Sequence, residues 1–424
     1  MPQAGYIDSW DINGEEYDIH DKGRGLPNGV ATLNSNGLIP TNQLALSKNL
    51  LSVVLSPILC REWTKTVTAD ITHIKRVGNL CLVAKQAQGL WWSEDGGLTL
   101  TLCEGIDPTY NVAVMECING LYLCWAGADG PFWSEDGKTW TPGTLGGSHI
   151  IVYNIVYLGG VYFGYSSAGS GYFAYSLDGK EWTRVTTFTN VTVNGILYEN
   201  NFWMVYTSKS VYKSSNGTTW APVSISGNPN ITHGLIFNHT FIFAASGKGM
   251  WWYDSANNTM VQTTVDTYTT TGLQCNNNIV VRGCNGTHGM WTSTDGKTWT
   301  VVTGDLASAT IRSLDYFKGM FICTVDSSNE WYSYNGTSWI QSDNDTLTGS
   351  PTFIHLNGLW FAKGQQKVSI DGLFWFPLLN LGTIKDISSS PEGLVLGANT
   401  GLYVSTVEQL VQKGYIDFGG APLL

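Results

Sequence analysis

The sequence carries few charges for its length and no cluster of basic residues. Only 13% of its 424 residues are Asp, Glu, Lys or Arg, and the formal net charge is −11. Proteins that bind nucleic acid need grouped Lys or Arg side chains to neutralise the phosphate backbone. We therefore expect no nucleic-acid partner.

Long apolar runs are missing as well. No stretch approaches the roughly 18 apolar residues of a membrane-spanning helix, and the first residues, MPQAGYIDSWD, have neither the basic nor the apolar region of a signal peptide. We expect no membrane insertion, and synthesis in a cytosol without export by the usual route.

Motifs for metals, cofactors and common catalytic chemistry are also absent. The eight cysteines form no C-x-x-C pair and mostly lie in apolar stretches such as LCLVA and MFICTV, which predicts buried thiols rather than a zinc site. The seven histidines are scattered singly, and there is no G-x-S-x-G, no H-E-x-x-H and no phosphate-binding loop. We expect no cofactor and no metal.

Glycine and aromatic residues, in contrast, are abundant. The chain has 49 Gly, 18 Trp and 20 Tyr, and Thr, Ser and Asn are frequent. This composition is typical of many short strands joined by tight turns. It predicts an all-β protein.

An internal repeat decides the architecture. A Ser-x-Asp-Gly-x-Thr-Trp pattern, seen for example as WSEDGKTWT and TSTDGKTWT, recurs every 36 to 42 residues. Its aligned first positions, including one degenerate and one truncated copy, are Ser93, Ser134, Ser176, Ser214, Tyr253, Ser293, Ser333, Ser369 and Ser405. Each period contains four apolar or alternating runs separated by Asn, Gly and Ser turn signals, which is the length and pattern of a propeller blade. We predict a β-propeller of about nine four-stranded blades, with eight as the alternative.

The two ends of the repeat predict how the ring closes. CREWTKTV (60–67) resembles an outer strand with no earlier strands before it, whereas residues 383–405 supply three strands and then stop. Together they make one complete blade. Closure of this kind removes two exposed sheet edges.

The repeated motif resembles the Asp-box, or BNR, hairpin of sialidase-type propellers, in which Ser, Asp and Trp close a turn. The resemblance implies a structural role for its acidic and aromatic residues, which are Asp95, Asp136, Asp178, Asp295, Asp371, Trp140, Trp182, Trp220, Trp299, Trp339 and Trp375.

The first residues resemble a different family. WDINGEEYDIHDK (10–22) is similar to a hairpin that precedes a fibre shaft, and GVATLNSNGLIPTNQLA (29–45) is similar to a recurring segment of bacteriophage tail fibres. The resemblance implies a virion-associated homotrimer. The predicted organisation is a fibre-like virion-attachment adaptor (1–48), an apolar connector (49–59), the propeller (60–405) and a C-terminal tail (406–424). The connector packs either between three copies or under the propeller.

A sialidase-like glycoside hydrolase is the enzymatic alternative. That family uses three arginines to hold a carboxylate, with a Tyr–Glu pair and an acidic proton donor. The chain has only six arginines, one of them in the adaptor and two beside motif tryptophans, so the triad is hard to assemble. We predict that the protein is not an enzyme.

One face of the ring is the expected binding surface. The links from outer strand to next inner strand share a face with the turns between second and third strands, and both are rich in Asp, Asn, Ser, Thr and Gly. Such side chains bind sugar hydroxyls, and an aromatic ring can stack on a pyranose. The candidate binding residues are Asp107, Tyr110, Asp129, His149, Tyr268 and His288.

The functional hypothesis is a tail fibre or receptor-binding protein of a virion tail, made in the cytoplasm of a bacterial host. Its expected partners are a host surface polysaccharide, bound without cleavage, and other tail proteins contacted through the adaptor. A purely structural virion decoration protein is the other alternative.

Overall fold

The computed structural model describes residues 9–12, 15–18, 63–166, 172–188, 191–263, 266, 268–326, 330–342, 347, 349–356, 359–363, 365–369, 372–373, 375–377, 381–390 and 393–406. Near the N-terminus, β1 (Ser9–Ile12) and β2 (Glu15–Asp18) pair antiparallel. The fibre-like segment 29–45, the connector and the tail from residue 407 lie outside the described residues. The described part contains no helix long and apolar enough to cross a membrane.

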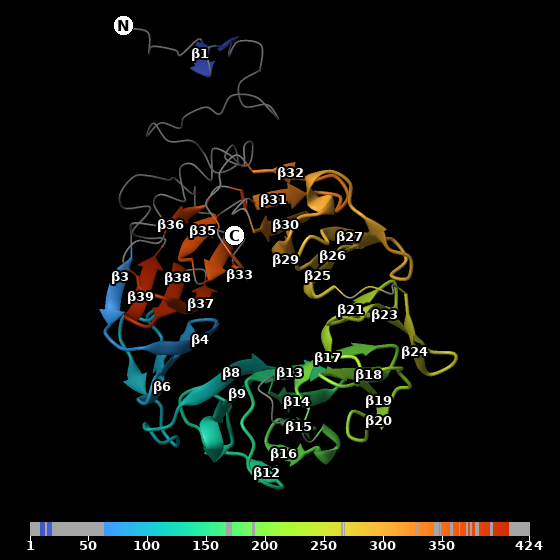
Figure 1. The fold of residues 1–424 in the computed structure, drawn as a ribbon. Helices are drawn as coiled ribbons and strands as arrows, with labels where there is room; N and C mark the ends of the chain where they lie inside the picture. The colour runs from blue at the N-terminus through green and yellow to red at the C-terminus, as the bar shows by residue number, and fades with distance from the viewer. Residues whose placement is uncertain are drawn as a thin grey trace, which may run out of the picture.

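Nine sheets follow one another around a ring (Figure 1). We number the blades in chain order, and within each the first strand is innermost. Blades 1 to 3 are formed by β4 (Ile71–Val77), β5 (Leu80–Lys85), β6 (Gly89–Ser93) and β7 (Thr101–Leu102); β8 (Val112–Ile118), β9 (Leu121–Ala126), β10 (Pro131–Ser134) and β11 (Thr141–Pro142); and β13 (Asn154–Leu158), β14 (Val161–Tyr165), β15 (Phe173–Ser176) and β16 (Glu181–Arg184).

The next three blades repeat this order. Blades 4 to 6 are formed by β17 (Val193–Glu199), β18 (Phe202–Thr207), β19 (Val211–Ser214) and β20 (Ala221–Pro222); β21 (Ile231–Phe237), β22 (Thr240–Ala245), β23 (Gly249–Asp254) and β24 (Thr259–Gln262); and β25 (Thr270–Cys275), β26 (Val280–Cys284), β27 (Met290–Ser293) and β28 (Thr300–Val301).

Blade 9 takes its outer strand from the other end of the chain. Blades 7 to 9 are formed by β29 (Ile311–Phe317), β30 (Met320–Val325), β31 (Glu330–Ser333) and β32 (Ile340–Gln341); β33 (Thr352–Leu356), β34 (Leu359–Lys363), β35 (Lys367–Ser369) and β36 (Phe376–Pro377); and β37 (Ile384–Ser390), β38 (Gly393–Ala398), β39 (Gly401–Thr406) and β3 (Thr64–Val67). Three short 3-10 turns complete the described elements, namely η2 (Gly127–Asp129), η3 (Thr186–Phe188) and η4 (Asp305–Ala307).

The closure confirms the composite blade and the count of nine. β3 pairs antiparallel with β39, with Thr64 opposite Val404 and Lys65 opposite Tyr403, and the two lie side by side in Figure 1. Blade 9 is then joined to blade 1 by a hydrogen bond from the backbone N–H of Ile74 to Oδ2 of Asp386 (2.9 Å). The ring therefore has no open seam between its first and last strands.

The turns of each blade fall on two opposite faces. Because neighbouring strands in a blade are antiparallel, the turns from first to second and third to fourth strand lie at one end, which we call the hairpin face. The turns from second to third strand and the links to the next blade lie at the other end, the loop face. The inner strands of seven blades carry a β-bulge near their loop-face end. Bulges increase local twist and re-aim side chains.

The blade links contain a strand that the periodic pattern did not predict. In the link between blades 2 and 3, β12 (Thr144–Gly146) pairs parallel with β16 and makes that sheet five-stranded. Isolated bridges join Glu104 to Thr139 and Ser224 to Thr259 in the same parallel manner. Each of these contacts ties the chain leaving one blade to the outer edge of the next.

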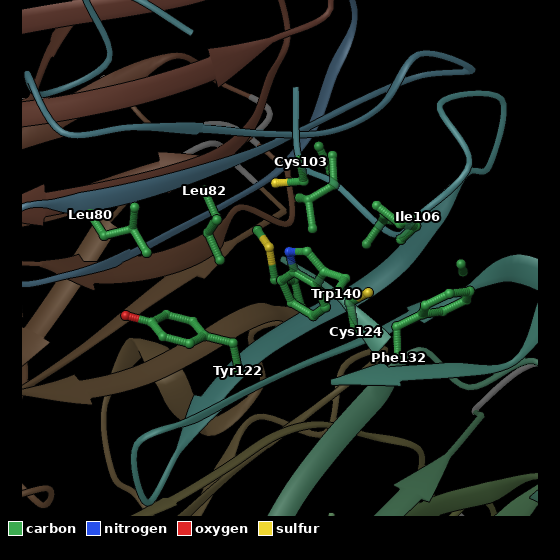
Figure 2. Close-up of a cluster of buried hydrophobic side chains, with 13 residues drawn as sticks. Leu80, Leu82, Cys103, Ile106, Tyr122, Cys124, Phe132 and Trp140 are labelled. Carbon is green, nitrogen blue, oxygen red and sulfur yellow. The ribbon is translucent and has the colours of Figure 1, made fainter. Parts of the chain in front are cut away.

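The hydrophobic core lies between blades. Figure 2 shows the cluster between blades 1 and 2, where Leu82 of β5 and Cys124 of β9 meet around Trp140. Trp140 is 2% exposed, and removing a buried Trp typically costs about 3–5 kcal/mol. The seven cysteines in the described part are free thiols, and burial raises the pKa of Cys81 and of Cys103 to about 12.

Candidate functional site

The repeated motif forms the same hydrogen-bonded turn on the hairpin face of successive blades. In blade 2, Oδ1 of Asp136 accepts hydrogen bonds from Ser134 Oγ (2.9 Å) and from the backbone N–H groups of Lys138 and Thr139 (2.7 and 2.8 Å). Gly137 adopts φ +74° and donates its N–H to Ser134 Oγ at 2.8 Å. This positive φ favours glycine, and a Cβ on Gly137 would lie 2.4 Å from a methyl of Leu80, which would have to move.

The turn also sets the charge of its carboxylates. Burial raises the pKa of the Asp136 carboxyl, but the hydrogen bonds from the turn outweigh this effect and leave the pKa below its ordinary value. The same balance lowers the pKa of Asp178, and that of Asp95 and Asp295 to about 2. These carboxylates are therefore ionised and engaged by the turn at neutral pH.

The motif tryptophans divide into two groups. The indole N–H donates to the carbonyl of the motif glycine in Trp140, Trp182, Trp339 and Trp375, at 2.9 to 3.1 Å. Trp220 and Trp299 have a buried indole nitrogen with no partner among the described residues. Asp371 lies outside the described residues.

Three of the candidate binding residues meet on the loop face, at the junction of blades 1 and 2. Asp107 Oδ1 accepts hydrogen bonds from the backbone N–H and the hydroxyl of Thr109 (2.7 and 2.6 Å), which lower the pKa of its carboxyl. The Tyr110 ring lies 6.1 Å from Phe132. The charge of Asp129, then loss of solvent and the charge of Asp107, raise the pKa of Tyr110, which therefore remains a neutral phenol.

Two further candidates form an aromatic pair on blade 6. Tyr268, in the link from blade 5, stacks on His288, in the turn from β26 to β27, with ring centroids 3.7 Å apart and planes 12° apart. The Trp291 ring lies 6.4 Å from Tyr268, and its N–H donates to the carbonyl of His288 (2.9 Å). Tyr268 and His288 are each partly exposed, so the stacked pair forms a partly exposed aromatic surface.

A buried ion pair holds this aromatic pair in place. Arg282 of β26 is fully buried and donates to Oδ2 and Oδ1 of Asp266 (2.8 and 3.1 Å), to the carbonyl of Tyr268 (3.3 Å) and to Thr270 Oγ1 (2.8 Å). The bidentate geometry fixes the guanidinium and the link that carries Tyr268. A buried charge of this kind must be paired.

The sequence did not lead us to Arg282 and Asp266 as site residues. Arg282 is the only charged residue in an apolar strand, IVVRGC. This pattern could have predicted a buried ion pair, because an arginine inside a buried strand requires a carboxylate partner. The partner itself lies 16 residues earlier, at a separation that no local pattern specifies.

The six candidates do not form one site. Asp107, Tyr110 and Asp129 gather between blades 1 and 2, whereas Tyr268 and His288 lie on blade 6, across the ring (Figure 1). His149 is exposed in the link before β13, and no contact among the described residues joins it to either group. In the described part of the chain no three His, Cys, Asp or Glu residues are placed to hold a metal ion.

Comparison with known proteins supplies no family. No protein-family model matches the chain, and no curated protein matches it. Solved structures show a similar shape at low similarity. The computationally designed Ika8 protein is 12% identical over 81% of this chain and 99% of its own, with a TM-score of 0.49.

Two natural proteins are similar at a comparable level. PorZ, a bacterial surface component of the type-IX secretion system of Porphyromonas gingivalis, is 12% identical over 80% of this chain and 62% of its own, with a TM-score of 0.43. YCF48 from Cyanidioschyzon merolae is 14% identical over 62% of this chain and 95% of its own, with a TM-score of 0.35. These similarities carry no functional argument, and the propeller assignment rests on the nine sheets themselves.

Proposed function

We propose that this protein is a receptor-binding protein of a bacteriophage tail whose propeller binds a host surface polysaccharide without cleaving it. The observation that carries the proposal is the stacked Tyr268–His288 pair on the loop face. A preformed aromatic surface bordered by polar loops suits a pyranose ring, because one face of the sugar is apolar and its hydroxyls take part in hydrogen bonds. The fibre-like sequence of residues 29–45 supports the phage setting.

The carboxylates of the repeated turns and of the loop-face candidates support binding rather than hydrolysis. Glycosidases use two carboxyl groups within about 5–10 Å of each other whose pKa values are driven apart. The repeated Asp residues are engaged in turns on the hairpin face, and both carboxylate oxygens of Asp266 are bound by Arg282. The carboxyl of Asp107 has a lowered pKa, which suits an acceptor for hydroxyls and not a proton donor.

Assembly completes the proposal. Residues 1–48 join the protein to other tail proteins and hold three copies together, so that three propellers face the cell surface. A modest affinity at each propeller is then multiplied by avidity. Light scattering on the full chain measures this directly: a trimer supports the arrangement, and a monomer at micromolar concentration argues against it.

The function is tested by retention on immobilised bacterial surface polysaccharides. We expect wild-type protein to be retained and Tyr268→Ala to lose most of the retention with little change in melting temperature. Tyr157→Ala is the matched control, because it removes a tyrosine that is 38% exposed on β13, away from the loop face. Mass spectrometry of the eluate should show no released oligosaccharide.

Each other outcome would indicate a different function or a different binding place. Release of sugar fragments would indicate a glycoside hydrolase. No retention on any polysaccharide would indicate a purely structural virion protein. Equal retention of Tyr268→Ala and wild type would place binding away from the aromatic pair.

A further inference from the structure

A second surface with the chemistry of a sugar site lies on the opposite, hairpin face. A hollow of about 670 Å³ opens between the first-to-second-strand turns of blades 5, 6 and 7, a volume within the usual range of small-molecule sites. Its described lining includes Asn238, Asn276, Asn277, Asn278, Tyr316 and Tyr334. None of the described residues that line it carries a charge at neutral pH.

Two of the four asparagines of this hollow, Asn277 and Asn278, are not explained by their turn. Asn is common in tight turns because it tolerates positive φ, and Asn238 does so at φ +46°. Asn277 and Asn278 are not among the residues with positive φ. The turn of blade 6 is held instead by Asn276, whose Oδ1 accepts from the N–H groups of Asn278 and Ile279 (2.8 and 3.0 Å). The carboxamides of Asn277 and Asn278, both exposed, thus provide donors and acceptors beside the hollow.

Tyr334 supplies an aromatic ring at the edge of the hollow. It occupies the second position of the repeated motif, which other blades fill with residues as different as Glu94, Leu177 and Thr294, so the turn itself does not require an aromatic residue there. The Tyr334 side chain is 59% exposed. Its ring meets Tyr332 edge to face at 5.9 Å, which restricts its orientation while leaving much of the ring in solvent.

Part of the lining of the hollow is apolar. Ile236, Phe237 and Cys275 line it together with the asparagines, and Phe237 is 2% exposed. Tyr316 packs against Phe321 at 4.5 Å between ring centroids. Carboxamides, a partly exposed ring and an apolar part of the lining match a ligand that has hydroxyls on its edges and C–H groups on its faces.

We propose that this hollow is a second carbohydrate-binding site, for an uncharged oligosaccharide, on the face opposite Tyr268 and His288. The inference goes beyond the proposed function, because it assigns a separate ligand site that does not depend on the aromatic pair. The absence of charge from the described lining favours neutral sugars over anionic ones. Stacking on Tyr334 and hydrogen bonds to Asn277 and Asn278 provide the recognition.

The experiment uses the full chain and an array of neutral oligosaccharides, followed by titration calorimetry with the sugar that binds best. We expect Tyr334→Ala to raise the Kd about tenfold, as loss of a stacking partner does, and Asn277→Ala to raise it as well. Tyr334→Phe should retain binding, because it keeps the ring. Tyr157→Ala is the control on the same face, since Tyr157 lies next to the corresponding turn of blade 3.

The two sites are distinguished by crossing the variants. Tyr268→Ala should leave binding to this hollow unchanged, and Tyr334→Ala should leave retention through the loop face unchanged when that polysaccharide does not occupy both. Binding of no neutral oligosaccharide, or equal Kd values for wild type and Tyr334→Ala, overturns the inference. Loss of all sugar binding in Tyr268→Ala alone would also overturn it, because the hollow would then have no affinity of its own.

Discussion

Replacing Arg282 by methionine should destabilise the protein strongly and disturb the loop face at the same time. The change keeps an unbranched side chain but removes the hydrogen bonds to Asp266, Thr270 and the carbonyl of Tyr268. Asp266 would then be a carboxylate without its guanidinium, in a place where its side chain is 9% exposed. Breaking a buried ion pair on one side typically costs about 3–5 kcal/mol.

The chain offers a matched control for this change. Arg312 pairs with Asp326, but the two side chains are 38% and 51% exposed. Exposed ion pairs contribute about 0–1 kcal/mol, so Arg312→Met should change the free energy of unfolding by no more than that. Both variants are compared with wild type by urea unfolding, followed by tryptophan fluorescence.

A double substitution separates lost pairing from lost packing. Adding Asp266→Leu to Arg282→Met removes the unpaired carboxylate and should recover part of the stability, because replacing both partners by apolar groups is often nearly neutral. The assigned role of the buried pair is wrong if Arg282→Met lowers the free energy of unfolding by less than about 1 kcal/mol, as expected for an exposed pair. It is also wrong if the double variant loses more unfolding free energy than the two single variants lose in sum.

Three further predictions concern closure, the repeated turn and pH. Deleting residues 1–48 should leave the melting temperature of the ring nearly unchanged, whereas deleting 1–68 removes β3 from β39 and should lower it; equal melting would refute the closure. Asp136→Ala should lower the free energy of unfolding in urea by about 1 kcal/mol, because the turn loses its acceptor; an unchanged free energy would show that these hydrogen bonds do not stabilise the turn. Burial, and next the charge of Arg282, lower the pKa of His233 below 6.5, so this group stabilises the fold above pH 6.5 and the benefit is lost as pH falls through the lowered pKa. His233→Gln should flatten that loss in unfolding measurements between pH 7 and pH 5, and an unchanged slope would contradict the assignment.

Much of the fold was predictable from the sequence because a propeller repeats its own local chemistry. The Ser-x-Asp-Gly pattern marks the turn between third and fourth strands wherever it occurs, and its spacing sets the number of blades. The closure was predictable for the same reason, since the strand at Thr64–Val67 matched an outer strand that the last blade lacked. β12 was not predicted, because it lies in a link between blades, where the sequence does not repeat, and pairs in parallel with β16 of the next blade.

The candidate sites were less predictable than the fold. Tyr268 and His288 were named individually from loop composition, but their stacking depends on Arg282 and Asp266, which are adjacent only after blade 6 has folded. Tyr334 was not predicted, because it occupies a position of the motif that tolerates many residues. Local patterns specify turns and strands, whereas sites on loops depend on contacts between segments that no period relates.

The most direct test of the account is the structure of the full chain bound to a fragment of the surface polysaccharide that it retains. The account predicts a sugar ring of that fragment against the Tyr268–His288 pair on the loop face, with its glycosidic bonds intact. A fragment bound only elsewhere on the ring, or cleaved at the loop face, would contradict it.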